Sequence, residues 1–203
     1  MARDRAARPE AKPLRLFVAV DIPEAAKRRV AEVVSAFKER IPAARWTRPE
    51  GWHVTLKFLG STWPRLFEEV RHAVAQSAAS GAPFQTSLTG VGVFPSPGRA
   101  RVVWVGLADP EGRFAPMVKV LDRQLAEHFV PEKRAFTPHL TVARLNPPQD
   151  IRDAAPDLVG TPVGSEPFRV DRLVLYRSHL SPAGARYEPI SEAPLAQPAA
   201  GEG

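Results

Sequence analysis

The same succession of elements occurs twice in this sequence, and the repeat limits the fold more than any other feature. A short apolar strand, an amphipathic helix, a loop and a second strand are predicted within residues 15–59, and the same order recurs within residues 102–145. The repeat is too long for a solenoid. Two copies of such a unit predict two lobes related by a pseudo-twofold axis.

Hydrophobic periodicity places the individual elements. Helical spacing of apolar residues predicts helices after Asp21, from Pro64 to about Gly81, and from about Phe114 to Leu125. The predicted strands are Arg15–Val20, Trp52–Leu59, Val102–Leu107, Phe136–Leu145 and Phe168–Tyr176. We therefore expect an α+β fold in which two small, mainly antiparallel sheets face each other and the helices pack outside them.

The two ends of the chain have a different composition from the rest. Residues 1–13 mix Ala, Arg and Pro without an apolar period, and residues 191–203 are mostly Ala, Pro, Gly and Glu. Both segments are predicted to be mobile tails. Residues 14–190 are expected to form a single bilobal domain.

Composition excludes several classes of site and partner. Cysteine is absent, so a disulfide scaffold, a thiol nucleophile and any cysteine-based metal site are ruled out. The longest apolar runs, Leu16–Val20 and Val102–Ala108, are far shorter than the roughly 20 residues of a membrane helix. We expect a cytoplasmic protein, monomeric and without an evident protein partner.

The basic excess indicates a polyanionic partner. The formal net charge is +6, and Arg supplies 22 of the 28 basic residues. Arginine binds phosphate in a bidentate manner, which suits RNA. An Arg-, Ala- and Pro-rich composition also arises in proteins encoded by GC-rich genes, so the charge alone does not decide the partner.

The informative residues lie on the second strand of each repeat. The first strand reads His53-Val54-Thr55-Leu56 and the second reads His139-Leu140-Thr141-Val142. Alternate residues of a strand share a face, so each His points the same way as its Thr while the apolar residues point into a core. The competing interpretation is that these are ordinary strand residues that face solvent.

Two imidazoles and two hydroxyls facing each other across a cleft suit phosphodiester cleavage. Displacement at phosphorus needs a base on the attacking oxygen and an acid on the leaving oxygen, and histidine serves either role near neutral pH. Threonine hydroxyls can donate hydrogen bonds to the non-bridging oxygens. No metal-ligand spacing and no glycine-rich phosphate loop is recognisable, so we expect neither a metal nor another cofactor.

These paired motifs resemble those of the 2H phosphoesterase superfamily. The flanking residues are most similar to its RNA 2′,3′-cyclic phosphodiesterase branch, also called 2′-5′ RNA ligase. The resemblance spans residues 15–190 and is carried by Arg15–Val20, Trp52–Gly60, Val102–Gly106, Pro138–Arg144 and Leu175–Ser178 with Gly184 and Tyr187. It implies a bilobal α+β fold and metal-independent opening of an RNA 2′,3′-cyclic phosphate to a 2′-phosphate.

The resemblance also implies roles for the motif residues. His53 would be the general acid that protonates the leaving 3′ oxygen, and His139 the general base that activates water. Thr55, Thr141 and Arg144 would hold the phosphoryl oxygens. The motifs are nearly symmetric, so the sequence by itself does not decide which histidine is the acid.

Arg144 presents a difficulty because its offset of five from His139 places it on the opposite face of a regular strand. It would reach the phosphate only if the strand ends, twists or bulges near Ala143. A surface arginine is the alternative.

Further candidates for RNA or base contacts are aromatic or basic residues near the motifs. A core position is the alternative for Phe17, and a solvated surface position for Arg99 and Arg101. These candidates are Phe17, Trp46, Arg99, Arg101 and His179.

Three other functions are kept as alternatives. A 2′-5′ ligase would use the same acid and base with a 5′-hydroxyl in place of water. A phosphodiesterase acting on a small cyclic nucleotide-derived phosphate would not need the basic surface. A non-catalytic RNA-binding module would not need a matched acid and base.

Overall fold

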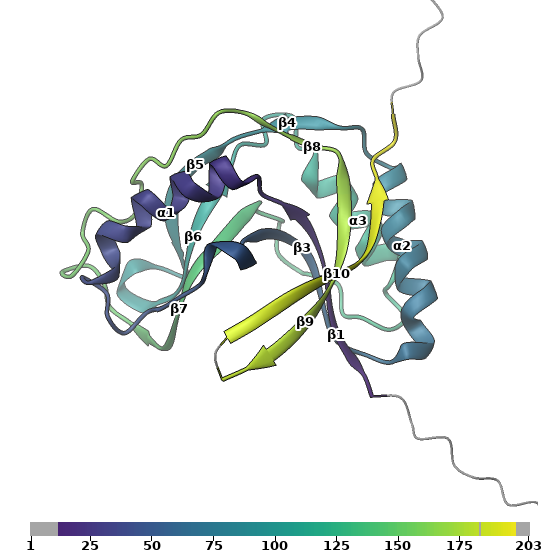
Figure 1. Cartoon of the computed structure of the whole chain (residues 1–203), viewed down its shortest axis with the longest axis horizontal. Helices are drawn as coiled ribbons and strands as arrows, with labels where there is room; N and C mark the ends of the chain where they lie inside the picture. Colours follow the sequence, from purple (N-terminus) through teal and green to yellow (C-terminus); the bar gives the residue numbers. More distant parts are fainter. Residues whose placement is uncertain (1–11, 183, 198–203) are drawn as a thin grey trace, which may run out of the picture.

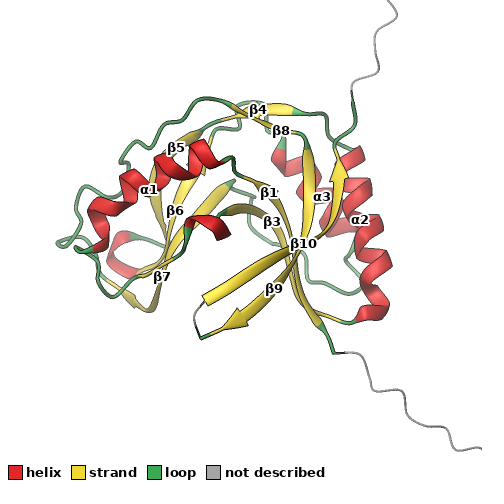
Figure 2. Ribbon diagram, viewed as in Figure 1, coloured by secondary structure: helices red, strands yellow, loops and turns green. Residues whose placement is uncertain are grey.

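The computed structural model describes residues 12–182 and 184–197. Strands and helices succeed one another as the duplication predicts, and three single-turn 3-10 helices lie in the connections (Figures 1 and 2). The α-helices are α1 (Glu24–Lys38), α2 (Phe67–Ala79) and α3 (Phe114–Gln124). The strands are β1 (Leu14–Asp21), β2 (Arg45–Trp46), β3 (His53–Thr62), β4 (Phe84–Thr86), β5 (Leu88–Phe94), β6 (Ala100–Leu107), β7 (His139–Gln149), β8 (Phe168–Val170), β9 (Arg172–Ser181) and β10 (Gly184–Pro194).

The main sheet has eight strands, and its two halves meet at one residue pair. The hydrogen-bonded order is β10-β9-β1-β3-β7-β6-β5, and β2 pairs with β7 beside β3. All these pairings are antiparallel. Between β3 and β7 the only paired residues are Val54 and Leu140. The expected α+β class with antiparallel sheets is confirmed, and the two predicted sheets are linked through this pair.

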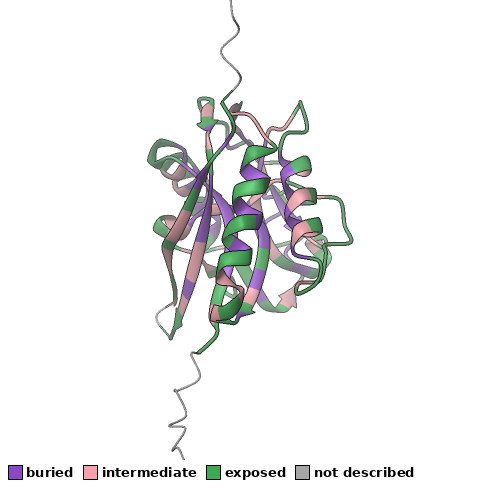
Figure 3. Cartoon of the chain, turned by 90° about the vertical axis from the view of Figure 1, so that its right-hand side faces the viewer, coloured by how far each residue is buried: buried purple, intermediate pink, exposed green. Residues whose placement is uncertain are grey.

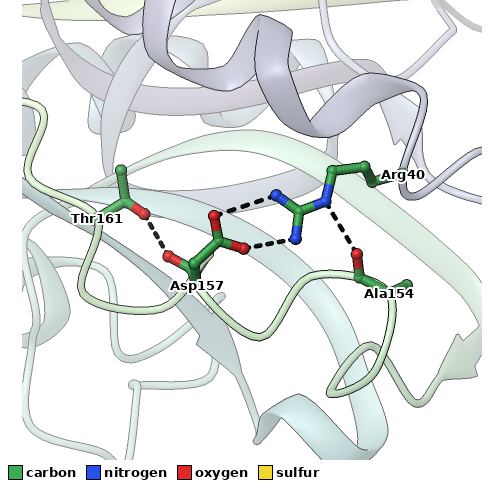
Figure 4. A network of polar contacts seen from close by, with 4 residues as sticks. All are labelled: Arg40, Ala154, Asp157 and Thr161. Carbon is green, nitrogen blue, oxygen red and sulfur yellow. Dashed lines mark hydrogen bonds and ion pairs between the residues drawn. The ribbon is translucent and has the colours of Figure 1, made fainter.

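The helices pack outside the sheet, and two of them cross between the halves. Helix α1 follows β1 but lies over the half that contains β5, β6 and β7 (Figure 1). Arg40, two residues beyond the end of this helix, donates to the carbonyl oxygen of Ala154 at 3.0 Å and forms a bidentate ion pair with Asp157 (Figure 4). Helix α3 follows β6 but packs against α2 and β3 in the other half. Each half therefore depends on a helix from the other repeat.

The core lies between the sheet and these helices. Helix α2 is buried along one stripe and exposed along the other, as its 3.6-residue period predicts (Figure 3). On β1, Leu16, Val18 and Val20 belong to this core cluster. The intervening Phe17 and Ala19 are also buried but lie on the opposite face of the strand, outside that cluster.

Two sequence expectations are corrected at the C-terminal end. Residues 191–194 complete β10, and Leu195 beyond them is 2% exposed, so the tail predicted over 191–203 begins too early. The strand predicted at Phe168–Tyr176 is interrupted at Asp171 and forms β8 and β9. The rest of that tail, residues 198–203, and most of the N-terminal tail, residues 1–11, lie outside the described residues.

Candidate active site

Strands β3 and β7 bring the two histidine motifs to one side of the sheet. Val54 and Leu140, which oppose each other across the junction, are both fully buried. Their chain neighbours point the other way, so the paired imidazoles and hydroxyls lie on the opposite face. In an antiparallel pair this register brings His53 towards Thr141, and Thr55 towards His139.

Each motif is followed by a β-bulge at the same position. Val18 and Ala19 of β1 pair with Lys57 and Thr55, so Leu56 is an extra residue in β3. Val103 and Trp104 of β6 pair with Ala143 and Thr141, so Val142 is the corresponding extra residue in β7. The burial patterns from His53 to Leu59 and from His139 to Leu145 are identical.

The bulges change which residues face the motif side. Leu56 and Lys57 are both buried, as are Val142 and Ala143, so the alternation shifts by one residue. Phe58 and Arg144 are consequently exposed on the same face as the preceding His and Thr. This is the bulge near Ala143 on which the expectation for Arg144 depended.

Backbone carbonyl groups fix the orientation of both imidazoles. Nδ1 of His53 donates to the carbonyl oxygen of Gly51 at 2.8 Å, and Nδ1 of His139 donates to that of Thr137 at 2.7 Å. A carbonyl oxygen only accepts, so Nδ1 carries the hydrogen in both rings. Nε2 is therefore the atom of each ring that is left to gain or lose a proton.

His53 is surrounded by aromatic rings. Phe17 stacks on it with ring centroids 4.6 Å apart, Tyr187 meets it edge-on at 5.0 Å, and Tyr176 lies at 6.0 Å. The pKa of His53 is lowered to about 4, chiefly by burial. The Gly51 hydrogen bond and the Asp21 charge oppose this shift, and the positive charges of Lys27 and Arg144 contribute to it.

A pocket of about 370 Å³ opens beside this ring. Tyr176 donates to Oδ1 of Asp21 at 2.5 Å in its wall, and Lys27, Glu50 and Tyr187 line it as well. Burial and this hydrogen bond raise the pKa of Tyr176, so the hydroxyl stays protonated.

His139 lies beside a flat aromatic surface. Phe94 stacks on Trp104 at 5.0 Å and meets the imidazole edge-on at 5.3 Å. A Cβ added at Gly92 would lie 2.2 Å from the indole of Trp104, and one at Gly106 would lie 3.3 Å from it. Only glycine at these positions allows the indole to lie flat on the sheet.

The structure places the other candidate residues differently. Phe17 is 2% exposed beneath His53, so it supports the imidazole and is not available to stack on a base. Trp46 packs against the core. His179 lies on the face of β9 opposite to Tyr176 and bonds Glu188 at 2.6 Å, so the structure does not bring it together with the two motifs, and its substrate contact stays a prediction. Arg99, just before β6, and Arg101, at its start, are both exposed, and their RNA contact stays a prediction.

Apart from Phe17, the aromatic residues beside the histidines are not among the site residues that the sequence predicts. Tyr176 and Trp104 reach the site through long-range pairing of β9 with β1 and of β6 with β7. One local signal in the sequence points to Trp104. Gly106 lies two positions after it, and the preceding strand has glycine at alternate positions, Gly90 and Gly92.

The described residues contain neither a cluster of candidate metal ligands nor a candidate membrane-spanning helix. No group of three or more His, Asp or Glu side chains lies close enough together there to hold a metal ion. Within the same residues, no helix combines the length and apolar character needed to cross a membrane.

Comparisons with known proteins match most of the chain. A family model described as the 2′-5′ RNA ligase superfamily matches residues 22–182, which include both motifs. A protein of Methanothermobacter thermautotrophicus named RNA 2′,3′-cyclic phosphodiesterase is 34% identical over 178 residues, covering 86% of this chain and 95% of that protein.

Solved structures agree with these sequence matches. The structure of TT0787 of Thermus thermophilus matches with a TM-score of 0.75 and 26% identity, covering 91% of this chain and 99% of that one. Apo LigT of E. coli matches with a TM-score of 0.71 and 25% identity, covering 92% of this chain and 100% of that one.

Proposed function

This chain belongs to the 2′-5′ RNA ligase superfamily, and from that premise we propose that it hydrolyses RNA 2′,3′-cyclic phosphate ends to 2′-phosphates. The relatives from four archaea and from Geobacillus, Thermotoga, Aquifex and Thermus all have the name RNA 2′,3′-cyclic phosphodiesterase. The observation that carries the proposal is the common face of the two motifs, each with a carbonyl-oriented imidazole.

His139 is the general base of the proposed reaction. Its Nε2 takes a proton from a water molecule, and the water oxygen attacks phosphorus. The bond between phosphorus and the 3′ oxygen breaks as the new bond forms, leaving the phosphate on the 2′ oxygen. Because Nδ1 is held by the carbonyl group of Thr137, the developing imidazolium keeps its orientation.

His53 is the general acid that protonates the leaving 3′ oxygen through Nε2. Burial lowers the pKa of His53 to about 4 in the free protein, so the ring is neutral at pH 7 before substrate binds. An anionic phosphate beside the ring favours its charged form and raises the pKa. His53 therefore takes up its proton together with the substrate.

Thr55 and Thr141 donate hydrogen bonds to the non-bridging oxygens, and Arg144 balances the negative charge that develops on them. Thr55 and Thr141 share the face of the histidines through strand alternation, and the bulge at Val142 brings Arg144 to that face. This arrangement requires no Lewis acid, so we expect turnover in the presence of a chelator.

The test is incubation of a short RNA that ends in a 2′,3′-cyclic phosphate, in EDTA, with the wild type and with His53→Ala and His139→Ala. We expect a 2′-phosphate product, and a loss of about 10²–10⁴-fold in each variant. An RNA with a free 5′-hydroxyl in the same mixture reports ligation. No hydrolysis by the wild type, or unchanged rates in both variants, contradicts the proposal.

A further inference from the structure

Two arginines face each other across strands β2 and β7. Arg45 pairs directly with Arg144, and Trp46 pairs with Ala143. Residues directly opposite in an antiparallel pair project from the same face with Cβ atoms about 5 Å apart. Trp46 packs against the core, so Arg45 projects from the other face, together with Arg144 and the histidine motifs.

Neither of these arginines is neutralised within the part of the chain that the structure describes. Both are exposed, and no described carboxylate lies within ion-pair distance of either. Like charges directly opposite each other destabilise a strand pair. An anionic ligand with more than one negative group would offset that cost.

Arg45 also extends towards the other half of the molecule. A Cβ placed on Gly184 would lie 4.0 Å from Nη2 of Arg45, so the guanidinium reaches the turn of the β9–β10 hairpin. This hairpin projects from the half that carries His53 towards the half that carries His139 (Figure 1). Arg45 therefore lies between Arg144 and the hairpin, where a strand attached to the reacting nucleotide can pass.

We propose that Arg45 binds the phosphate on the 5′ side of the terminal nucleotide and so makes the site prefer an RNA strand to a mononucleotide. This inference rests on the proposed function, in which Arg144 contacts the reacting cyclic phosphate. Consecutive phosphates of the strand then meet consecutive guanidinium groups. A mononucleoside 2′,3′-cyclic phosphate without a 5′ phosphate lacks the second group.

The first test compares Arg45→Gln with the wild type on a dinucleotide ending in a 2′,3′-cyclic phosphate and on the corresponding mononucleoside cyclic phosphate. We expect kcat/KM for the dinucleotide to fall about 10- to 100-fold, mainly through KM, because a hydrogen-bonded charged group is lost. The value for the mononucleoside is unchanged. Arg123→Gln, an exposed arginine on α3 behind the sheet, is the matched control and changes neither value.

A neutral linkage gives the complementary test. Replacing the bridging phosphate of the dinucleotide by a methylphosphonate should cost the wild type as much as Arg45→Gln does, and should cost Arg45→Gln little more. Equal losses on the dinucleotide and the mononucleoside, or no loss on either, would overturn the assignment of Arg45.

Binding separates failure of this inference from failure of the proposed function. A labelled dinucleotide that ends in a 2′-phosphate is titrated by fluorescence anisotropy at several salt concentrations. Arg45→Gln should bind more weakly, and its slope of log K against log salt should be smaller by about 0.7. If the wild type hydrolyses neither substrate, the proposed function fails, and this titration still decides whether Arg45 contacts the upstream phosphate.

Discussion

Residues with the same motif position have different surroundings in the two halves. His53 stacks on Phe17 and is enclosed by Tyr176 and Tyr187, whereas His139 lies at the edge of Phe94 and Trp104. The two motifs are nearly identical in sequence, so the lowered pKa of His53 arises from the strands that pack beside it. It is a tertiary property that the motif alone does not predict.

The enclosure of His53 makes stability depend on pH. The pKa of His53 is lowered to about 4 from an unfolded value of 6.5, so between these pH values the unfolded chain binds more protons. With respect to His53, the free energy of unfolding therefore has its highest value above pH 6.5 and falls by up to about 3 kcal/mol as the pH drops to 4. Urea unfolding of the wild type and His53→Gln at pH 7 and pH 4.5 measures this; the variant should lose less between the two pH values. Equal losses would show that His53 titrates normally.

The position of Arg144 gives a second prediction at this scale. Because the bulge at Val142 turns Arg144 to the face of the histidines, Arg144→Ala should lower kcat for the cyclic phosphate about 10²–10³-fold. The thermal midpoint should hardly change, since the side chain is exposed. Steady-state kinetics beside Arg123→Ala as control measures the effect, and wild-type kinetics would remove Arg144 from the site.

Among the elements, β3 and β7 determine the site because each combines a buried face with a bulge. Lys57 stabilises the first bulge from the core side of the sheet. Its side chain is buried, and its ammonium group donates to Asp122 of α3. In the second strand Ala143 occupies the corresponding position. The bulges align the hydroxyl, the imidazole and the residue five positions after it on one surface.

The glycines of β5 and β6 give a prediction for an element. Gly92→Ala would place a Cβ only 2.2 Å from the indole of Trp104 and should cost about 1–3 kcal/mol of stability. Displacement of the indole should also lower kcat, because Trp104 borders His139. Gly98→Ala is the control, since its nearest contact is the flexible Arg152 side chain at 3.5 Å. Thermal unfolding and near-ultraviolet circular dichroism measure both; an unchanged Gly92→Ala variant would contradict the packing.

The sequence predicts these elements well where apolar periodicity decides. The strands around His53 and His139 and the three helices follow from period-2 and period-3.6 patterns. The bulges do not, because an extra residue is defined only by the register with β1 and β6. Three features of the site depend on the register between paired strands: the position of Arg144, the enclosure of His53 by Tyr176, and the face from which Arg45 projects.

The two halves of the molecule are held together because each repeat contributes a helix that packs on the other half. Helix α1 covers the half that contains β7, and α3 packs against β3 in the other half. The duplication in the sequence predicts two units but not this crossing, which depends on which sheet each helix can cover. Both motifs lie on one face of a sheet whose halves share a single pair, Val54 and Leu140.

In the proposed reaction His53 and His139 act as acid and base on opposite sides of one phosphate. The most direct measurement replaces the 3′ bridging oxygen of the cyclic phosphate by sulfur, because a thiolate leaves without needing a proton. With the oxygen substrate, His53→Ala and His139→Ala should each lose about 10²–10⁴-fold. With the sulfur substrate, His53→Ala should recover most of that loss and His139→Ala should not. Recovery by His139→Ala instead, or by neither variant, would contradict the account.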